Sequence, residues 1–273
     1  MKKIAVIGTG FRRTGDDKPP QEILDVRAES FDPRLIETRL PAFPINEINR
    51  NMSEIANIET GLRAEAEGFD AVFINTVGDY GLSALRSAVR IPVIGAGQAT
   101  MHAACQLGGN FSIVTIWPPQ LLFIYHGLLQ LYRMEDRCVS IRCVSADEEL
   151  DTLSDDKNFV TDMRSGETSQ QDRIVHQCEK AIRDDGADTI MLGCTCMSPA
   201  AKDIAARVDA PVLNPLTTGY KAAEMQLALG LSHSVHKYPQ AGGDRHDHYR
   251  AMADAVKALD FQDPRGQTKE AAE

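Results

Sequence analysis

The sequence lacks any long hydrophobic run, and no stretch approaches the about 18 consecutive apolar residues that a membrane-spanning helix needs. It also lacks excess positive charge. Its formal net charge of -10 argues against binding to nucleic acid or to an anionic membrane surface. The segment 1–8 starts basic and turns apolar, but the apolar stretch is too short for an export signal and indicates a buried first strand. We therefore expect a cytoplasmic protein with neither a nucleic-acid nor a membrane partner.

Common cofactor and metal signatures are missing as well. The segment 8–15 is similar to a dinucleotide-binding loop, but Arg13 stands where the third glycine belongs, and no phosphate-binding P-loop pattern is present. Cys194 and Cys196 have no second ligand pair at a spacing suited to zinc. We expect no cofactor and no metal. Arg12 is instead a candidate to bind a substrate carboxylate or imide oxygen, with plain solvated charge as the alternative.

The six cysteines are scattered, and several lie within apolar periodic segments. In a cytoplasmic protein this distribution predicts free thiols and not a disulfide framework.

Short apolar runs alternate with helical patterns along most of the chain. This alternation predicts an α/β fold with parallel sheets and right-handed crossovers. The expected strands are 3–7, 70–75, 91–95, 111–116, 139–144, 188–192 and 211–213, and the expected helices are about 47–66, 81–89, 97–107, 120–132, 168–184, 198–207 and 216–229. The polar stretch 152–166 is expected to be a surface loop.

Two parts of the chain, residues 68–108 and 186–230, repeat one another. Residues 68–76 align without a gap on residues 186–194, and the match resumes after a slip of one residue. This duplicated strand–loop–helix–strand–helix unit predicts two Rossmann-like lobes related by a pseudo-two-fold axis. Positions 76 and 194, which end the two aligned segments, are then expected to face each other across an active-site cleft between the lobes.

The domain boundaries follow from this repeat. We expect residues 1–98 plus 213–232 to form the first lobe and residues 99–212 the second. Residues 233–273 are expected to form a C-terminal extension with one helix.

The loop after the expected strand 188–192 carries the strongest candidate for catalysis. Ser198 and Pro199 are suited to begin a helix, which places Cys194 just ahead of its N-terminus. The field of a helix N-terminus favours a thiolate, and backbone N–H groups near Gly193 and Thr195 can receive a carboxylate. The alternative is that Cys194 is simply a small buried residue.

The equivalent loop of the first copy contributes polar groups of a different kind. Asn75 and Thr76 supply an amide and a hydroxyl, and Val77 follows them. An ordinary strand-to-helix turn is the alternative reading. Tyr125 follows another expected strand end and is a candidate to border the cleft.

Several ordered segments together resemble the aspartate/glutamate/hydantoin racemase superfamily, nearest its hydantoin and allantoin racemase branch. These segments are 78–82, 92–95, 99–102, 111–115, 192–194 and 228–231, and the resemblance spans roughly residues 1–232. It implies cofactor-independent proton transfer at a carbon next to a carbonyl or carboxylate, with two cysteines flanking the substrate. Cys194 matches the second cysteine, whereas Thr76 occupies the position of the first.

This departure leaves three hypotheses open. The first is a racemase or other isomerase acting on a small-molecule carboxylate or cyclic imide, such as an amino-acid derivative or hydantoin, with Cys194 as the acid/base. The second is a lyase in which Cys194 alone protonates an enediolate, as in the single-cysteine arylmalonate decarboxylases that the sequence is similar to, because a threonine hydroxyl is too weak an acid to rest as a base. The third is a binding protein without catalysis. We also expect a homo-oligomer.

Overall fold

The computed structural model describes residues 1–8, 18–40, 42–155, 157–165, 168–240 and 245–258. The chain divides into two compact units, and each is described by itself. Unit 1 contains residues 1–75, 79–95 and 220–273, and unit 2 contains residues 76–78 and 96–219. Among the described residues, no helix combines the length and the apolar character that crossing a membrane requires.

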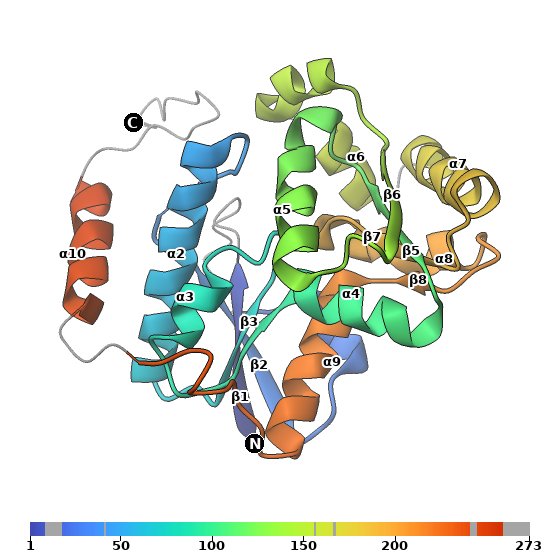
Figure 1. The fold of residues 1–273 in the computed structure, drawn as a ribbon. Coiled ribbons are helices and arrows are strands. Elements are labelled where there is room, and N and C mark those ends of the chain that lie inside the picture. The colour runs from blue at the N-terminus through green and yellow to red at the C-terminus, as the bar shows by residue number, and fades with distance from the viewer. Residues whose placement is uncertain (9–17, 41, 156, 166–167, 241–244, 259–273) are drawn as a thin grey trace. The chain divides into compact units, whose positions relative to one another are not determined.

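Unit 1 is built on a four-stranded parallel sheet with the strand order β2-β1-β3-β4. Its elements are β1 (Lys2–Gly8), α1 (Gln21–Val26), β2 (Phe31–Glu37), α2 (Glu47–Ala66), β3 (Ala71–Ile74), α3 (Leu82–Arg86), β4 (Val93–Gly95) and α10 (Arg245–Ala258). Figure 1 shows α2 and α3 beside this sheet and α10 beside α2.

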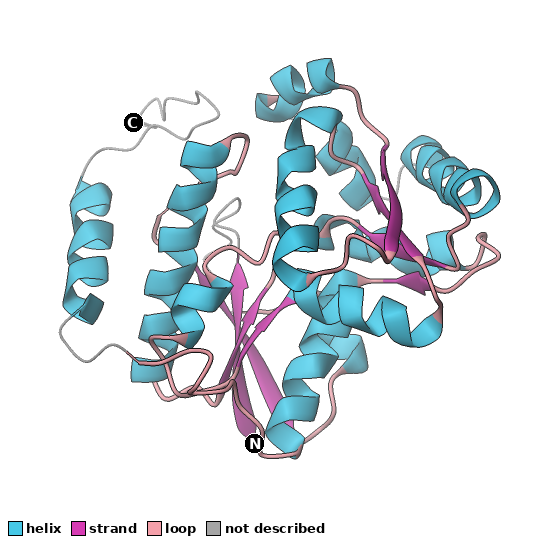
Figure 2. Cartoon of the chain, in the orientation of Figure 1, coloured by secondary structure: helices cyan, strands magenta, loops and turns pink. Residues whose placement is uncertain are grey.

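Unit 2 repeats this plan with the strand order β6-β5-β7-β8, again all parallel. Its elements are α4 (Ala96–Leu107), β5 (Phe111–Thr115), η1 (Pro119–Leu121), α5 (Leu122–Tyr132), β6 (Cys138–Cys143), η2 (Asp147–Ser154), α6 (Phe159–Ser165), α7 (Thr168–Asp185), β7 (Thr189–Leu192), η3 (Thr195–Ala200), α8 (Ala201–Ala205) and β8 (Val212–Leu213). Figure 2 shows helices packed around the strands. Helix α9 (Pro215–Ala228) contains the boundary between the units.

The predicted α/β class with parallel sheets is confirmed, and the internal repeat extends to the strand order of both sheets. In each sheet the order is second, first, third and fourth strand of that unit. The two aligned strands, β3 and β7, therefore occupy the same place in their own sheets.

The repeat also preserves the turn that leads into each of these strands. Gly68 and Gly186 both adopt a positive φ, of 79° and 74°, which an L side chain rarely tolerates. Asp70 then accepts a hydrogen bond from the backbone N–H of Lys3 at 2.8 Å, and Asp188 accepts one from that of Gly109 at 2.8 Å. In each unit a carboxylate at the start of the third strand holds the backbone near the start of the first strand.

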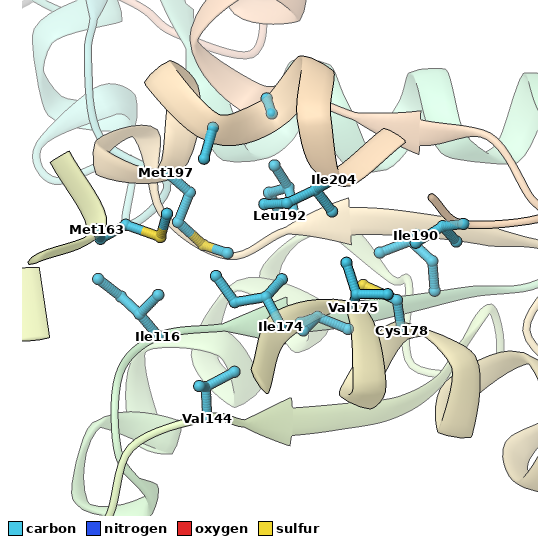
Figure 3. Close-up of a cluster of buried hydrophobic side chains, with 14 of the residues drawn as sticks. Ile116, Val144, Met163, Ile174, Val175, Cys178, Ile190, Leu192, Met197 and Ile204 are labelled. Atoms are coloured by element: carbon cyan, nitrogen blue, oxygen red, sulfur yellow. The ribbon is translucent and has the colours of Figure 1, made fainter. Parts of the chain in front are cut away.

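One apolar cluster forms the core of unit 2 on the face of the sheet covered by α6 to α8 (Figure 3). Leu192 from β7 packs there with Met163 from α6, Ile174 from α7, Met197 from η3 and Ile204 from α8, and each of these side chains is fully buried. Burying side chains of this size contributes about 1.5 to 3 kcal/mol each. Because Leu192 and Met197 belong to this core, the segment between them is anchored at both ends.

The structure corrects two expectations in this region and in unit 1. Residues 152–166 are not simply a surface loop, because α6 places Phe159 and Met163 one helical turn apart and buries both. Strand β2 was not expected at all, because Asp32, Pro33 and Arg34 interrupt its apolar pattern. It lies at an edge of the sheet, where one side of the strand has no neighbour and the missing N–H of a proline costs no hydrogen bond of the ladder.

The unit boundaries lie at 95/96 and 219/220, whereas the sequence places them at 98/99 and 212/213. The expected separate C-terminal extension is grouped with unit 1. Helix α10 docks there through Ala253, which is fully buried against Leu40, and through Asp254, which accepts a hydrogen bond from Arg39 at 2.7 Å.

A bidentate ion pair joins an outer strand of unit 2 to its longest helix. Arg142 of β6 donates from Nε and Nη2 to the two carboxylate oxygens of Asp185 in α7, both at 2.7 Å. Hydrogen bonding to Arg142 lowers the pKa of Asp185 below its usual value and outweighs the opposing effect of burial.

We predict that Asp185→Asn lowers the free energy of unfolding by about 1 kcal/mol at neutral pH. A carboxyl whose folded-state pKa is depressed stabilises the fold above its unfolded pKa, and this contribution is lost as the pH falls through the folded pKa. Urea unfolding should therefore show a gap between wild type and variant that narrows below a pH of about 4. Asp184→Asn, which removes the same charge from the exposed neighbouring residue, is the control, and an equal loss in that variant would contradict the assignment.

Candidate active site

The segment that follows β7 is a tight turn that begins at Cys194. Cys194 is extended and lies at the start of η3, and its Sγ accepts a hydrogen bond from the backbone N–H of Cys196 at 3.1 Å. The expectation that Ser198 begins a helix here is wrong, because η3 already starts at Thr195. Ser198 instead accepts a hydrogen bond from Asn214 Nδ2 at 2.7 Å, and its side chain is buried.

Cys194 forms a disulfide with Cys196 in this structure, with their Cα atoms 5.1 Å apart. Free thiols are confirmed for Cys105, Cys138, Cys143 and Cys178, and the expectation of free thiols is wrong for this pair. The turn of η3 brings together two sulfur atoms from residues that are two apart in sequence, and sequence spacing alone does not reveal such a turn. Both bonded side chains are half-buried, so Cys194 is not sealed inside the core.

Gly193 fixes the position of this turn against strand β5. A Cβ atom at Gly193 would lie 2.5 Å from Cβ of Thr115, a distance that no side chain can occupy. The backbone N–H of Gly193 donates to the carbonyl of Val114 at 2.8 Å, which continues the ladder with β5 by one residue. The residue before Cys194 is therefore held in contact with the neighbouring strand.

Tyr125 of α5 holds the other side of the same peptide. Its hydroxyl donates to the carbonyl of Gly193 at 2.8 Å and lies 2.7 Å from Oγ1 of Thr115. Because Tyr125 gives its single hydroxyl proton to Gly193, Thr115 is the donor in the bond between the two hydroxyls, and its Oγ1 also accepts from the backbone N–H of Trp117 at 3.2 Å. Burial raises the pKa of Tyr125 well above its ordinary value, which keeps the hydroxyl protonated and able to donate.

Thr115 is a positioning residue that the sequence alone did not single out. Its signal is a polar side chain at the C-terminal end of a buried strand, one step before the loop. Tyr125 was predicted to contact substrate, and that role stays a prediction. What the structure adds is an internal role, because its hydroxyl is bonded within unit 2.

The equivalent turn in the first copy carries different groups. Thr76 is half-buried, and its Oγ1 accepts a hydrogen bond from the backbone N–H of Gly78 at 3.3 Å. Val77 is buried. Residues 76–78 are grouped with unit 2, the unit that contains Cys194, whereas Asn75 is grouped with unit 1.

Gly81, which follows in this loop, packs closely against helix α2. Gly81 precedes α3 with a φ of 77°, and a Cβ atom there would lie 2.8 Å from the carbonyl oxygen of Glu54 in α2. Its freedom of conformation serves packing within unit 1.

The remaining predicted residues are placed as follows. Arg12 lies outside the described residues. Gly193 and Thr195 flank Cys194 on either side. Among the described residues, no group of three or more His, Cys, Asp and Glu side chains is arranged to hold a metal ion.

Comparison with known proteins agrees with the fold and the repeat. Residues 27–223 match the family described as Asp/Glu/Hydantoin racemase. The chain is 30% identical over 186 residues to a hydantoin racemase of Pseudomonas sp. strain NS671, covering 67% of this chain and 70% of that protein. It is also 30% identical to a hydantoin racemase of Rhizobium meliloti over 189 residues, covering 68% and 72% of the two chains.

Solved structures share the fold at lower identity. Allantoin racemase from Klebsiella pneumoniae superposes with a TM-score of 0.77 at 24% identity, covering 89% of this chain and 95% of that one. A liganded mutant of arylmalonate decarboxylase gives a TM-score of 0.59 at 15% identity, covering 82% and 92%.

The family match over residues 27–223 and the hydantoin racemase relatives define the class, which is a racemase-type isomerase. The chain belongs to the Asp/Glu/hydantoin racemase family, and it is an enzyme of that isomerase type.

We predict that Tyr125→Phe and Thr115→Val each lower the free energy of unfolding by about 2 kcal/mol, because each leaves buried polar groups of the Gly193 turn without a partner. The double variant should lose clearly less than the sum of the two. Urea unfolding of the four proteins measures this coupling. His126→Gln, at an exposed position next to Tyr125 on the same helix, is the control, and additive losses would show that the two hydroxyls do not cooperate.

Proposed function

We propose that this enzyme transfers a proton at a carbon next to a carbonyl or carboxylate, with the Cys194 thiol as the acid/base and without a cofactor. The substrate is a small carboxylate or cyclic imide, such as a hydantoin or an amino-acid derivative. The observation that carries the proposal is the location of Cys194, which follows the C-terminal end of β7 in a chain of this family. In parallel α/β sheets, ligands bind at that end of the strands.

The geometry of the turn supports a role in chemistry more than one in packing. Leu192 and Met197 are fully buried and anchor the segment, whereas Cys194 between them is half-buried. The N–H group of Cys196 points at the sulfur and can stabilise negative charge on it when it is a thiolate. Gly193 and Thr195 are proposed to bind the substrate oxygens through their backbone or hydroxyl groups.

Thr76 bears on whether the enzyme can use two bases. Racemisation through two bases needs a proton acceptor on each face of the substrate carbon, and a threonine hydroxyl is too weak an acid to serve as a resting base without an activating partner. We propose that Thr76, with Asn75, Val77, Arg12 and Thr195, binds the substrate and stabilises the enediolate.

A second candidate function follows from the same residue. If an enediolate forms by loss of carbon dioxide instead of by proton removal, a single thiol suffices to protonate it. A decarboxylating lyase with Cys194 as its proton donor therefore remains the alternative, and the relation in fold to arylmalonate decarboxylase is compatible with it.

We predict that Cys194→Ala lowers substrate-dependent proton exchange by about a hundredfold or more, because no other group replaces the thiol. The measurement is deuterium incorporation in deuterium oxide, with reductant present, against a panel of hydantoins, amino acids and substituted malonates. Incorporation at a chiral carbon without other mass change identifies a racemase, and release of carbon dioxide identifies a lyase. Cys143→Ala, which removes a half-buried thiol from β6, is the matched control, and full activity in Cys194→Ala would refute the assignment.

We further predict that Thr76→Cys raises the rate of proton exchange by about tenfold or more, because it supplies a second thiol at the position equivalent to Cys194. Comparing the interconversion of both enantiomers in wild type, Thr76→Cys and Thr76→Val measures this effect. A Thr76→Cys enzyme no faster than Thr76→Val would show that residue 76 does not face the reacting carbon.

A further inference from the structure

The disulfide between Cys194 and Cys196 is incompatible with the chemistry proposed for Cys194. A sulfur atom in a disulfide carries no proton to donate, and it lacks the negative charge with which a thiolate accepts one. The thiol form and the bonded form of this residue must therefore differ in activity, if the proposed function holds.

The surrounding backbone suits both forms. The Cα atoms of the pair are 5.1 Å apart, within the range of about 4.4 to 6.8 Å that a disulfide requires. The turn is held by contacts that do not involve the sulfur atoms, namely those of Gly193 with Thr115 and Tyr125 and the burial of Met197. These contacts do not depend on the S–S bond, so they can hold the turn in the dithiol form as well.

The bond between them separates Cys194 and Cys196 from the other four cysteines, which are free. Cys194 and Cys196 are both half-buried, so part of each side chain is open to small reagents. Burial raises the pKa of Cys138 and of Cys143 to about 11 and that of Cys178 to about 12. Near neutral pH these three remain protonated, and a protonated thiol reacts slowly with oxidants.

We infer that Cys194 and Cys196 form a reversible redox-modification site that switches the enzyme between an active dithiol and an inactive disulfide. This inference rests on the proposed function. The oxidant is a small hydroperoxide and the reductant is a dithiol. Cys196 acts here as the partner that resolves oxidised Cys194, and its side chain has no other assigned role.

The reaction balances in two steps. The Cys194 thiolate attacks an oxygen of the hydroperoxide, the O–O bond breaks and a sulfenic acid forms, while the departing oxygen takes a proton from solvent and leaves as water or alcohol. The Cys196 thiol then attacks the sulfenic sulfur, the S–S bond forms, and a second water leaves with its proton. A dithiol reverses this by exchange, so that it is oxidised to its own disulfide while both protein thiols are regenerated.

The test uses the full-length enzyme and hydrogen peroxide as the oxidant. Residues 184–202 lie between Arg183 and Lys202 and contain no internal lysine or arginine, so trypsin releases both cysteines in one peptide with no other cysteine. After a small molar excess of peroxide, this peptide should be lighter by two hydrogen atoms and should resist alkylation. Proton exchange should fall at least about tenfold in parallel and return fully with dithiothreitol.

Two variants locate the site. Cys196→Ser should form a sulfenic acid at Cys194 that dimedone traps, and it should lose the protection that the disulfide gives against irreversible inactivation. Cys143→Ser should keep the wild-type response in both mass and activity. Each activity is compared with that of the same variant in its reduced state.

The outcomes distinguish this inference from the proposed function. A peptide that stays at its reduced mass while activity is lost overturns the redox site and leaves the catalytic proposal standing. A complete mass change without any loss of exchange shows that the disulfide forms but that Cys194 is not the acid/base, and it overturns both the switch and the proposed function. A reversible mass change in an enzyme that shows no exchange in either state overturns the claim that the pair switches activity, and with it the proposed function.

Discussion

The turn that carries Cys194 depends on the missing side chain at Gly193. Only glycine lets β7 end against Thr115, because a Cβ atom would come within 2.5 Å of it. The hydroxyl of Tyr125, which is itself hydrogen-bonded to that of Thr115, then holds the glycine carbonyl on the opposite side. Cys194 thus follows directly after a peptide group that both β5 and Tyr125 of α5 hold in place. Its location is a property of the packed unit, and the chemistry we assign to it requires such a fixed position.

The two units show how one scaffold accommodates different chemistry. Strand order, the positive-φ glycines and the aspartates that follow them are the same in both copies. These repeated features are structural, and each has a clear physical reason. The copies diverge where structure no longer requires a particular residue, at Thr76 in one and Cys194 in the other. Under the proposed function, this difference between Thr76 and Cys194 fits a reaction whose two proton transfers are not equivalent.

Local patterns predicted much of this fold, and tertiary context decided the rest. Alternating apolar runs and helical periods located the strands of both repeats, because buried parallel strands are apolar on both faces. Strand β2 was missed because Pro33 is tolerated only at an edge, and sequence does not reveal edges. Helix α6 was missed because two buried residues, Phe159 and Met163, carry little periodic signal. For the site, the strand ends pointed to Cys194 and Thr76, but the bond to Cys196 and the hydrogen bonds of Tyr125 depend on contacts in three dimensions.

The central claim is that the sulfur of Cys194 meets the substrate. Ligand protection tests it most directly: the reduced enzyme is alkylated with iodoacetamide with and without a substituted hydantoin, and the peptide 184–202 is compared with the one that contains Cys105. We predict that ligand slows alkylation of Cys194 and leaves Cys105, which is also half-buried, unaffected. Equal rates at Cys194 with and without every ligand of the panel that the enzyme turns over would contradict the account.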